Sequence, residues 1–129
     1  MNHWNQYLLD SDTLIEYLRG REQALGFFSN LVGNLAVSVI TVAKLYAGVR
    51  NDRERQILTD FLATLTIIPV DRAIAERGGL YCRQYKQSHG TGLDDSLIAA
   101  TAVTIGSRLV SFNRRHFPMI TDLVVPYER

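Results

Sequence analysis

The sequence has a single cysteine, Cys82, and this scarcity excludes two kinds of site. A lone cysteine cannot close a disulfide within the chain, and it cannot supply the several thiolates of a cysteine-rich zinc site; such usage is typical of a reducing compartment. An excess of charge of one sign is also lacking, because 14 Lys and Arg residues oppose 13 Asp and Glu residues. The formal net charge of +1 therefore neither requires nor excludes a nucleic acid partner.

Long apolar runs are absent as well. No run of residues reaches the length of a membrane-spanning helix, and no basic N-terminal segment leads into an apolar run with a cleavage site. We therefore expect a cytoplasmic protein without a membrane partner. The 129 residues, of which 47% are hydrophobic, predict a single domain over residues 1–129 with one core.

Short apolar runs alternate with longer amphipathic runs along the chain. The expected strands cover residues 7–9, 35–40, 66–70, 108–111 and 123–125. The expected helices cover residues 13–19, 22–30, a segment around 42–46, 52–65, 71–88 and 97–105. This alternation predicts an α/β fold with a mostly parallel central sheet of about five strands and helices on both faces. In such sheets, ligands bind outside the carboxyl ends of the strands.

Two adjacent carboxylates, Asp94 and Asp95, stand at the start of the most apolar predicted helix. A helix start offers free N–H groups and the positive end of the helix dipole, so one aspartate can simply cap the helix. The second aspartate is then not needed as a cap, and its side chain can point toward a cleft.

Polar residues also follow the other predicted strands. Asp10 and Asp12 follow the first, Asn113 follows the fourth, and either Ser38 or Thr41 can cap the helix after the second. We expect Asp10, Asp95 and Asn113 to meet at one edge of the sheet.

Carboxylates that meet in this way repel each other unless a cation joins them, and oxygen ligands favour Mg²⁺ or Mn²⁺ over zinc. The pattern predicts a metal held by Asp10 and Asp95. A simpler alternative, in which each aspartate only caps its own helix, stays open. Asp12 and Asp94 are expected to support the site or to face solvent.

Four segments of the chain together carry a family resemblance. They are LLDSDTLI at 8–15, SVITVA at 38–43 before LYAG at 45–48, DSLIAATA at 95–102, and LVSFNRRHF at 109–117. In this order and at these spacings, over almost the whole chain, they resemble a PIN-domain protein of the VapC toxin type.

The resemblance implies a three-layer α/β/α sandwich and a Mg²⁺-dependent endoribonuclease that is the toxin of a type II toxin–antitoxin system. On this pattern Asp10, Asp95 and Asn113 match the catalytic positions, and Asp10 and Asp95 match the metal ligands. Asp12 matches a secondary polar position. His116 matches a residue that anchors its loop or contacts the substrate.

Lys44 departs from the family pattern. Before Leu-Tyr the family usually has a glutamate, whereas this chain has a cation. We expect the Lys44 ammonium to lie beside Asp10 and Asp95 and to neutralise them, which would weaken both Mg²⁺ binding and cleavage.

The resemblance also implies three partners: RNA, a second copy of the chain in a homodimer, and a small antitoxin whose helix fills an apolar groove. Four arginines are candidates for RNA contacts: Arg53, Arg55, Arg114 and Arg115. Six apolar or aromatic residues are candidates for the groove: Leu14, Tyr17, Leu18, Phe27, Leu45 and Tyr46. Core packing is the simpler explanation for Leu14 and Leu45.

Two alternatives stay open. In a haloacid-dehalogenase-like phosphatase, Asp10 would be the nucleophile, Asp12 the acid/base and Lys44 the clamp, with metal ligands from Asp94 and Asp95. That family does not account for residues 113–117, and its usual first motif has the threonine one position later than Thr13. The other alternative is a PIN-fold module that binds RNA or protein without cutting, because Lys44 has disabled the metal site.

Overall fold

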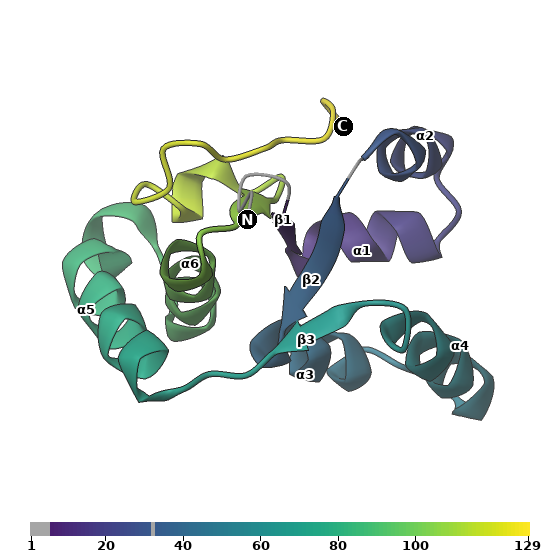
Figure 1. Ribbon diagram of the computed structural model, residues 1–129, viewed down its shortest axis with the longest axis horizontal. Coiled ribbons are helices and arrows are strands. Elements are labelled where there is room, and N and C mark those ends of the chain that lie inside the picture. Colours follow the sequence, from purple (N-terminus) through teal and green to yellow (C-terminus); the bar gives the residue numbers. More distant parts are fainter. Residues whose placement is uncertain (1–5, 32) are drawn as a thin grey trace.

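A parallel sheet enclosed by helices forms the centre of the computed structural model, which describes residues 6–31 and 33–129 (Figure 1). Its strands are β1 (Gln6–Leu9), β2 (Asn34–Ser38), β3 (Thr66–Ile68) and β4 (Arg108–Val110). Within the described residues they form one four-stranded sheet in the order β3-β2-β1-β4, and every pair is parallel. The pairing of β1 with the edge strand β4 brings together the N-terminal and C-terminal parts of the described chain.

The helices are α1 (Ser11–Leu18), α2 (Glu22–Asn30), α3 (Val39–Ala47), α4 (Asp52–Leu62), α5 (Arg72–His89) and α6 (Leu93–Ile105), with a short 3₁₀ turn η2 (Arg114–His116). Two helices follow each of the first three strands, as the sequence predicts. None of the helices in the described ranges combines the length and the apolar character that a bilayer span requires.

The core lies on both faces of the sheet because successive side chains of a strand point to opposite faces. Leu8 and Leu109 pack on one face with Ile98 of α6. Leu9 and Val110, each the next residue along its strand, pack on the other face with apolar residues of α1, α3 and α4. The predicted three-layer α/β/α sandwich is thus confirmed.

The predicted number of strands was wrong. Residues 123–125 do not form a fifth strand; Val124 makes an isolated parallel bridge to Val110, with its N–H donating to Leu109 O at 2.9 Å and its carbonyl accepting from Ser111 N at 3.0 Å. The ladder cannot continue through Pro126, which has no N–H to donate.

Of the two predicted caps of α3, Ser38 is confirmed and Thr41 is wrong, and the predicted start of α6 also differs. α3 begins at Val39, inside the predicted strand, because Ser38 Oγ accepts from Ile40 N at 3.0 Å; Thr41 is a buried residue inside the helix and does not cap it. α6 begins at Leu93 with Gly92 as its N-cap, so Asp94 and Asp95 both lie in its first turn.

Candidate active site

Asp10 is held between β1 and α1 and has two sets of contacts. It is only 4% exposed, and its Oδ1 accepts from Ser11 N at 2.8 Å as the N-cap of α1. Its Oδ2 accepts from Ser111 Oγ at 2.7 Å, across 101 positions of sequence. The capping role and the site role expected for Asp10 are therefore compatible.

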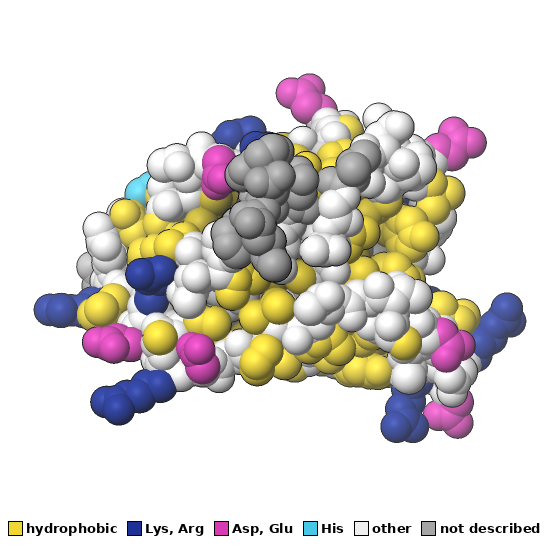
Figure 2. All heavy atoms as spheres, viewed as in Figure 1, with side chains coloured by type: hydrophobic (Ala, Val, Ile, Leu, Met, Phe, Trp, Pro, Cys, Tyr) yellow, Lys and Arg dark blue, Asp and Glu magenta, His cyan; other side chains and the backbone are white. Residues whose placement is uncertain are grey.

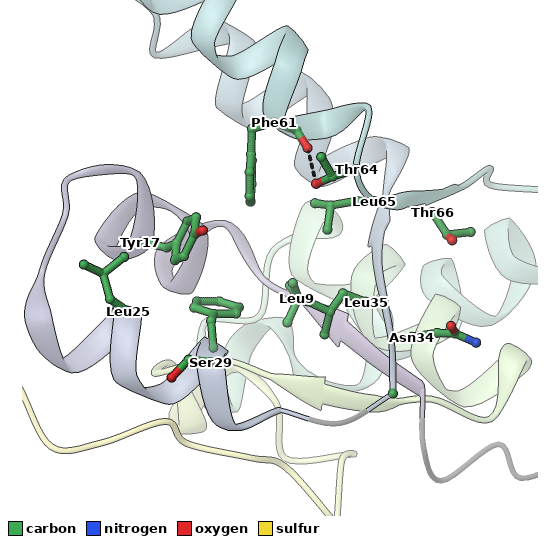
Figure 3. A pocket seen from close by; sticks show the side chains of 12 residues that line it. Leu9, Tyr17, Leu25, Ser29, Asn34, Leu35, Phe61, Thr64, Leu65 and Thr66 are labelled. Atoms are coloured by element: carbon green, nitrogen blue, oxygen red, sulfur yellow. Dashed lines mark hydrogen bonds between the residues drawn. The ribbon is translucent and has the colours of Figure 1, made fainter.

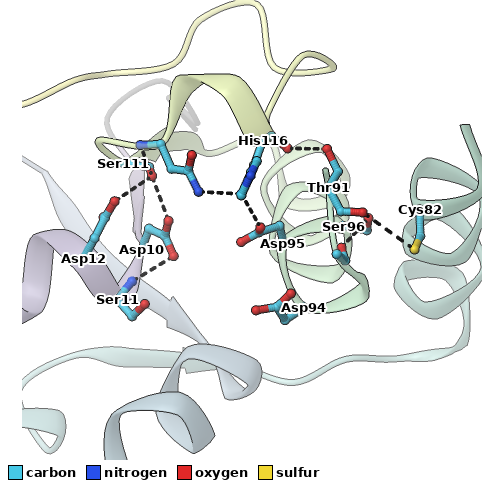
Figure 4. A network of polar contacts seen from close by, with 12 residues as sticks. Asp10, Ser11, Asp12, Cys82, Thr91, Asp94, Asp95, Ser96, Ser111 and His116 are labelled. Carbon is cyan, nitrogen blue, oxygen red and sulfur yellow. Dashed lines mark hydrogen bonds and ion pairs between the residues drawn. The ribbon is translucent and has the colours of Figure 1, made fainter. Parts of the chain in front are cut away.

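A continuous network of polar contacts joins Asp10 to Asp95 (Figure 4). Ser111 Oγ accepts from Asn113 N at 3.0 Å, and the Asn113 side-chain amide lies 2.7 Å from His116 Nδ1. The same His116 nitrogen lies 3.1 Å from Asp95 Oδ2. Because Nδ1 either accepts or donates, the tautomer of His116 decides which of the two contacts is a full hydrogen bond. The structure thus brings the three predicted catalytic residues into one cluster.

Ser111 is a residue of this network that the sequence did not single out. It is fully buried, and its hydroxyl lies 2.7 Å from Asp10 Oδ2 and 3.3 Å from Asp12 Oδ2. The signal was available in the pairing of the two strands: Leu9 lies opposite Val110, so the residues that follow them meet at the same sheet edge. The sequence predicts Ser111 as the last residue of a strand, whereas in the structure it directly follows β4.

Asp12 fastens the loop after β4 to α1. Its Oδ2 accepts from Phe112 N at 3.1 Å, whereas its Oδ1 is buried without a hydrogen-bond partner among the described residues. Burial, together with the nearby charge of Asp10, raises the pKa of the Asp12 carboxyl to about 6.

Lys44 faces the acidic cluster, but its direct partner is Asp94. Its Nζ lies 3.0 Å from Asp94 Oδ2, and both side chains are partly exposed, at 36% and 47%. Burial disfavours the lysine charge, but the Asp94 carboxylate outweighs this effect, so the pKa of Lys44 is raised and that of Asp94 is lowered. The expected position beside Asp10 and Asp95 is thus corrected: Lys44 acts on that pair through its charge, not by contact.

Asp10 and Asp95 both have raised pKa values, and burial is the main cause. The charge of Asp94 raises both values further, while Lys44 lowers them. The single ammonium therefore compensates the buried negative charge only in part. A further cation would stabilise the ionised pair.

The chemistry of these side chains suits a hard divalent cation, because carboxylate and amide oxygens are the ligands that Mg²⁺ prefers. Their arrangement is less favourable. In the part of the chain that the structure describes, no group of three or more His, Cys, Asp or Glu side chains is placed to hold a metal ion. Lys44 stands at the rim of the cluster, where it competes by charge with any ion that Asp10 and Asp95 would bind.

The remaining predicted residues lie outside the network. Thr41 is buried in α3, one turn before Lys44, and its hydroxyl has no partner among the described residues. Arg114 and Arg115 are exposed on η2, directly before His116. The other two arginines, Arg53 and Arg55, are exposed on α4, an element that contributes no residue to the network.

A pocket of about 530 Å³, lined by both apolar and polar residues, lies on the opposite face of the sheet from α6, between α1, α2 and α4 (Figure 3). Tyr17, Phe28 and Phe61 form its aromatic wall. The centre of the Tyr17 ring lies 5.0 Å from that of Phe28 and 5.3 Å from that of Phe61. Apolar side chains are exposed between α2 and α4 on the face that Figure 2 shows. Of the six predicted groove residues only Tyr17 lines this cavity, and Leu14 and Leu45 are buried in the core.

Comparison with known proteins gives a consistent result. The PIN domain family matches residues 7–121. The chain is 39% identical to "Ribonuclease VapC10" of Mycobacterium tuberculosis over 93% of this chain and 92% of that protein. It is 34% identical to "Ribonuclease VapC2" of Haemophilus influenzae, over 92% and 94%. Among solved structures, a toxin–antitoxin complex from Klebsiella pneumoniae has a TM-score of 0.81 and 29% identity, with 95% of this chain and 99% of that chain covered.

These similarities are incompatible with the haloacid-dehalogenase-like phosphatase, which has a different fold. The geometry agrees, because that enzyme would need Lys44 against the nucleophile Asp10, whereas Lys44 contacts Asp94. The match over residues 7–121, the parallel sheet and the identity to VapC proteins all lead to one family. The chain belongs to the PIN-domain family, within its VapC type.

Proposed function

We propose that this protein is a Mg²⁺-dependent endoribonuclease and the toxin of a type II toxin–antitoxin system. The observation that supports it best is the network that links Asp10 to Asp95 through residues 111–116 at the carboxyl edge of the sheet. The similar proteins named ribonucleases support the choice of RNA as substrate. An RNA substrate in turn favours the cytoplasm as the place of action.

In this proposal Asp10 and Asp95 hold the metal and Asn113 orients the site. When bound, the ion would activate a water and stabilise the charge that develops on the scissile phosphate. The chain itself fixes the geometry: Ser111 holds the Asp10 carboxylate, and His116 holds Asp95. The exposed Arg114 and Arg115 are positioned to contact RNA phosphates beside the cluster.

Lys44 limits this activity in our proposal. A cation whose charge reaches Asp10 and Asp95 opposes the binding of a divalent ion to the same pair. We therefore expect little RNA cleavage by the chain as it stands, and Lys44→Glu should increase it because the change replaces a repelling charge with an oxygen ligand.

RNA cleavage in Mg²⁺ tests the proposal with three proteins: the chain itself, Lys44→Glu, and Lys44→Glu combined with Asp10→Asn. We expect cleavage by the Lys44→Glu protein alone. If Lys44→Glu binds RNA but does not cut it, the chain is a binding module and the enzyme proposal is wrong. Equal cleavage with and without Asp10→Asn would reject Asp10 as a catalytic residue.

We also propose an antitoxin and a second copy of the chain as protein partners. The similar Klebsiella pneumoniae structure is a toxin–antitoxin complex, and the pocket between α1, α2 and α4, with its aromatic wall, offers a surface for a helix of the antitoxin. For the homodimer, light scattering at tens of micromolar, by order of magnitude, is the direct test. A strict monomer at that concentration would remove the dimer from the proposal.

A further inference from the structure

A glycine-threonine-glycine turn, residues 90–92, connects α5 to α6, and each of its residues lies against a residue of the candidate site. Gly90 ends α5 in the left-handed conformation, with φ of +66°. A Cβ added there would lie 3.4 Å from His116 Nε2, so the backbone of this turn passes directly along the histidine ring. A substitution at Gly90 would be strained in any case, because L side chains rarely adopt this φ.

Thr91 makes the most specific contact of the turn. It is fully buried, and its Oγ1 donates to the carbonyl oxygen of His116 at 2.9 Å, across 25 positions of sequence. This bond fastens the 3₁₀ turn η2 to the start of α6, so the main chain of His116 and the helix that carries Asp95 are held together (Figure 4).

Gly92, which has no side chain, leaves room for the Asp94 carboxylate. As the N-cap of α6 it precedes the acidic pair, and a Cβ at this position would lie 2.7 Å from Asp94 Oδ1. A side chain here would push aside the carboxylate that binds Lys44. The turn is thus in close contact with both His116 and Asp94.

We propose that Thr91 is a positioning residue, whose hydroxyl sets the distance between the His116 imidazole and the Asp95 carboxylate. The ring contacts Asp95 and Asn113 through Nδ1, and the position of the ring follows from the position of its own main chain. η2 has only three residues, so its internal hydrogen bonds alone hold it weakly. The bond from Thr91 supplies the missing restraint.

The matched variants are Thr91→Val and Thr91→Ser. Valine keeps the volume and the branching of threonine but cannot donate a hydrogen bond, whereas serine keeps the hydroxyl. The first measurement, in the chain as it stands, is the ¹⁵N chemical shifts of the His116 imidazole, assigned with a His116→Gln control, and the midpoint of thermal unfolding shows that each variant is folded. We expect changed imidazole shifts in Thr91→Val and parent-like shifts in Thr91→Ser. Unchanged shifts in Thr91→Val would overturn the proposal.

The second measurement is RNA cleavage in the Lys44→Glu background, and this part rests on the proposed function. Thr91→Val should lower kcat by about tenfold to a hundredfold with little change in KM, since misplacing a catalytic group by about 1 Å has effects of this order. Thr91→Ser should restore kcat. Changed imidazole shifts with unchanged kcat would overturn the positioning role in catalysis. If the Lys44→Glu protein does not cut RNA at all, the proposed function fails, while the imidazole shifts still decide whether Thr91 positions His116.

Discussion

At the scale of single residues, the site depends on how each carboxylate oxygen is used. One oxygen of Asp10 caps α1 and the other accepts from Ser111, so the two hydrogen bonds partly offset the cost of burying the charge. Asp12 has fewer hydrogen bonds to offset its burial, because its buried Oδ1 has no partner within the described part of the chain. Burial nevertheless raises the pKa of both carboxyl groups.

The stability of the fold should fall as the pH rises from about 4 to about 6. With its pKa raised to about 6, folded Asp12 holds its proton more tightly than in the unfolded chain, so ionisation favours unfolding. The loss begins near the unfolded pKa and is complete above the folded one. Two pKa units correspond to about 3 kcal/mol, which partial solvent exposure reduces.

Urea unfolding of the parent and of Asp12→Asn at pH 4 and pH 7 measures this effect. Asparagine cannot ionise but can still accept from Phe112 N through its amide oxygen, so the variant should lose less stability than the parent between the two pH values. The same loss in both proteins would show that Asp12 does not titrate in this range.

At the scale of elements, the packing of α5 on α6 depends on one glycine. Gly78 is buried, and a Cβ there would lie 2.6 Å from Leu97 Cδ2 and 3.1 Å from the Leu97 Cα. The second distance involves backbone, which cannot rotate away. Gly78→Ala should therefore lower the free energy of unfolding by about 1–3 kcal/mol, the usual cost of overpacking.

Gly79 is the matched control for this substitution, since it is exposed on the same helix with nothing within 4 Å of an added Cβ. Gly79→Ala should raise stability by about 0.5–1 kcal/mol, because alanine loses less entropy in a helix than glycine. Denaturant unfolding of both variants gives the comparison. If Gly78→Ala and Gly79→Ala changed the free energy of unfolding by the same amount, this result would contradict the close contact of α5 with α6.

Periodicity predicted the elements well where one pattern dominated and less well at their ends. The apolar run predicts α6, but the predicted start is too late, because aspartate is a more common N-cap than glycine. In the structure Gly92 takes that position, where a side chain would meet Asp94. Residues 123–125 have the composition of a strand, yet composition does not reveal that only Val124 reaches its neighbour.

At the scale of the whole molecule, the site exists because the sheet order places β4 beside β1. The sequence predicted that Asp10, Asp95 and Asn113 would gather at one edge, since the carboxyl ends of parallel strands share an edge. It could not predict the partner of Lys44, because a long lysine side chain reaches several carboxylates and only its rotamer selects Asp94.

RNA binding should depend on salt chiefly through the arginines beside the site. Each phosphate contact contributes about 0.7 to the slope of log affinity against log salt for a single strand. Replacing Arg114 and Arg115 with alanine should lower that slope by about 1.4, and the same change at Arg53 and Arg55, on α4, should alter it less. Fluorescence anisotropy with labelled RNA in EDTA measures both pairs. A flat salt response of the parent would exclude phosphate contacts altogether.

The binding of Mg²⁺ tests the account most directly, measured by calorimetry on the chain, on Lys44→Glu and on Lys44→Met. A unit charge about 5 Å from a divalent ion costs about 2 kcal/mol in water and about 7 kcal/mol at an effective dielectric constant of about 20, so even the lower value weakens binding more than tenfold. We predict weak or no binding by the chain, tighter binding by Lys44→Met, and the tightest by Lys44→Glu, with Asp95→Asn abolishing the gain. Equal affinity of the chain and Lys44→Glu would contradict the claim that Lys44 opposes a metal at Asp10 and Asp95.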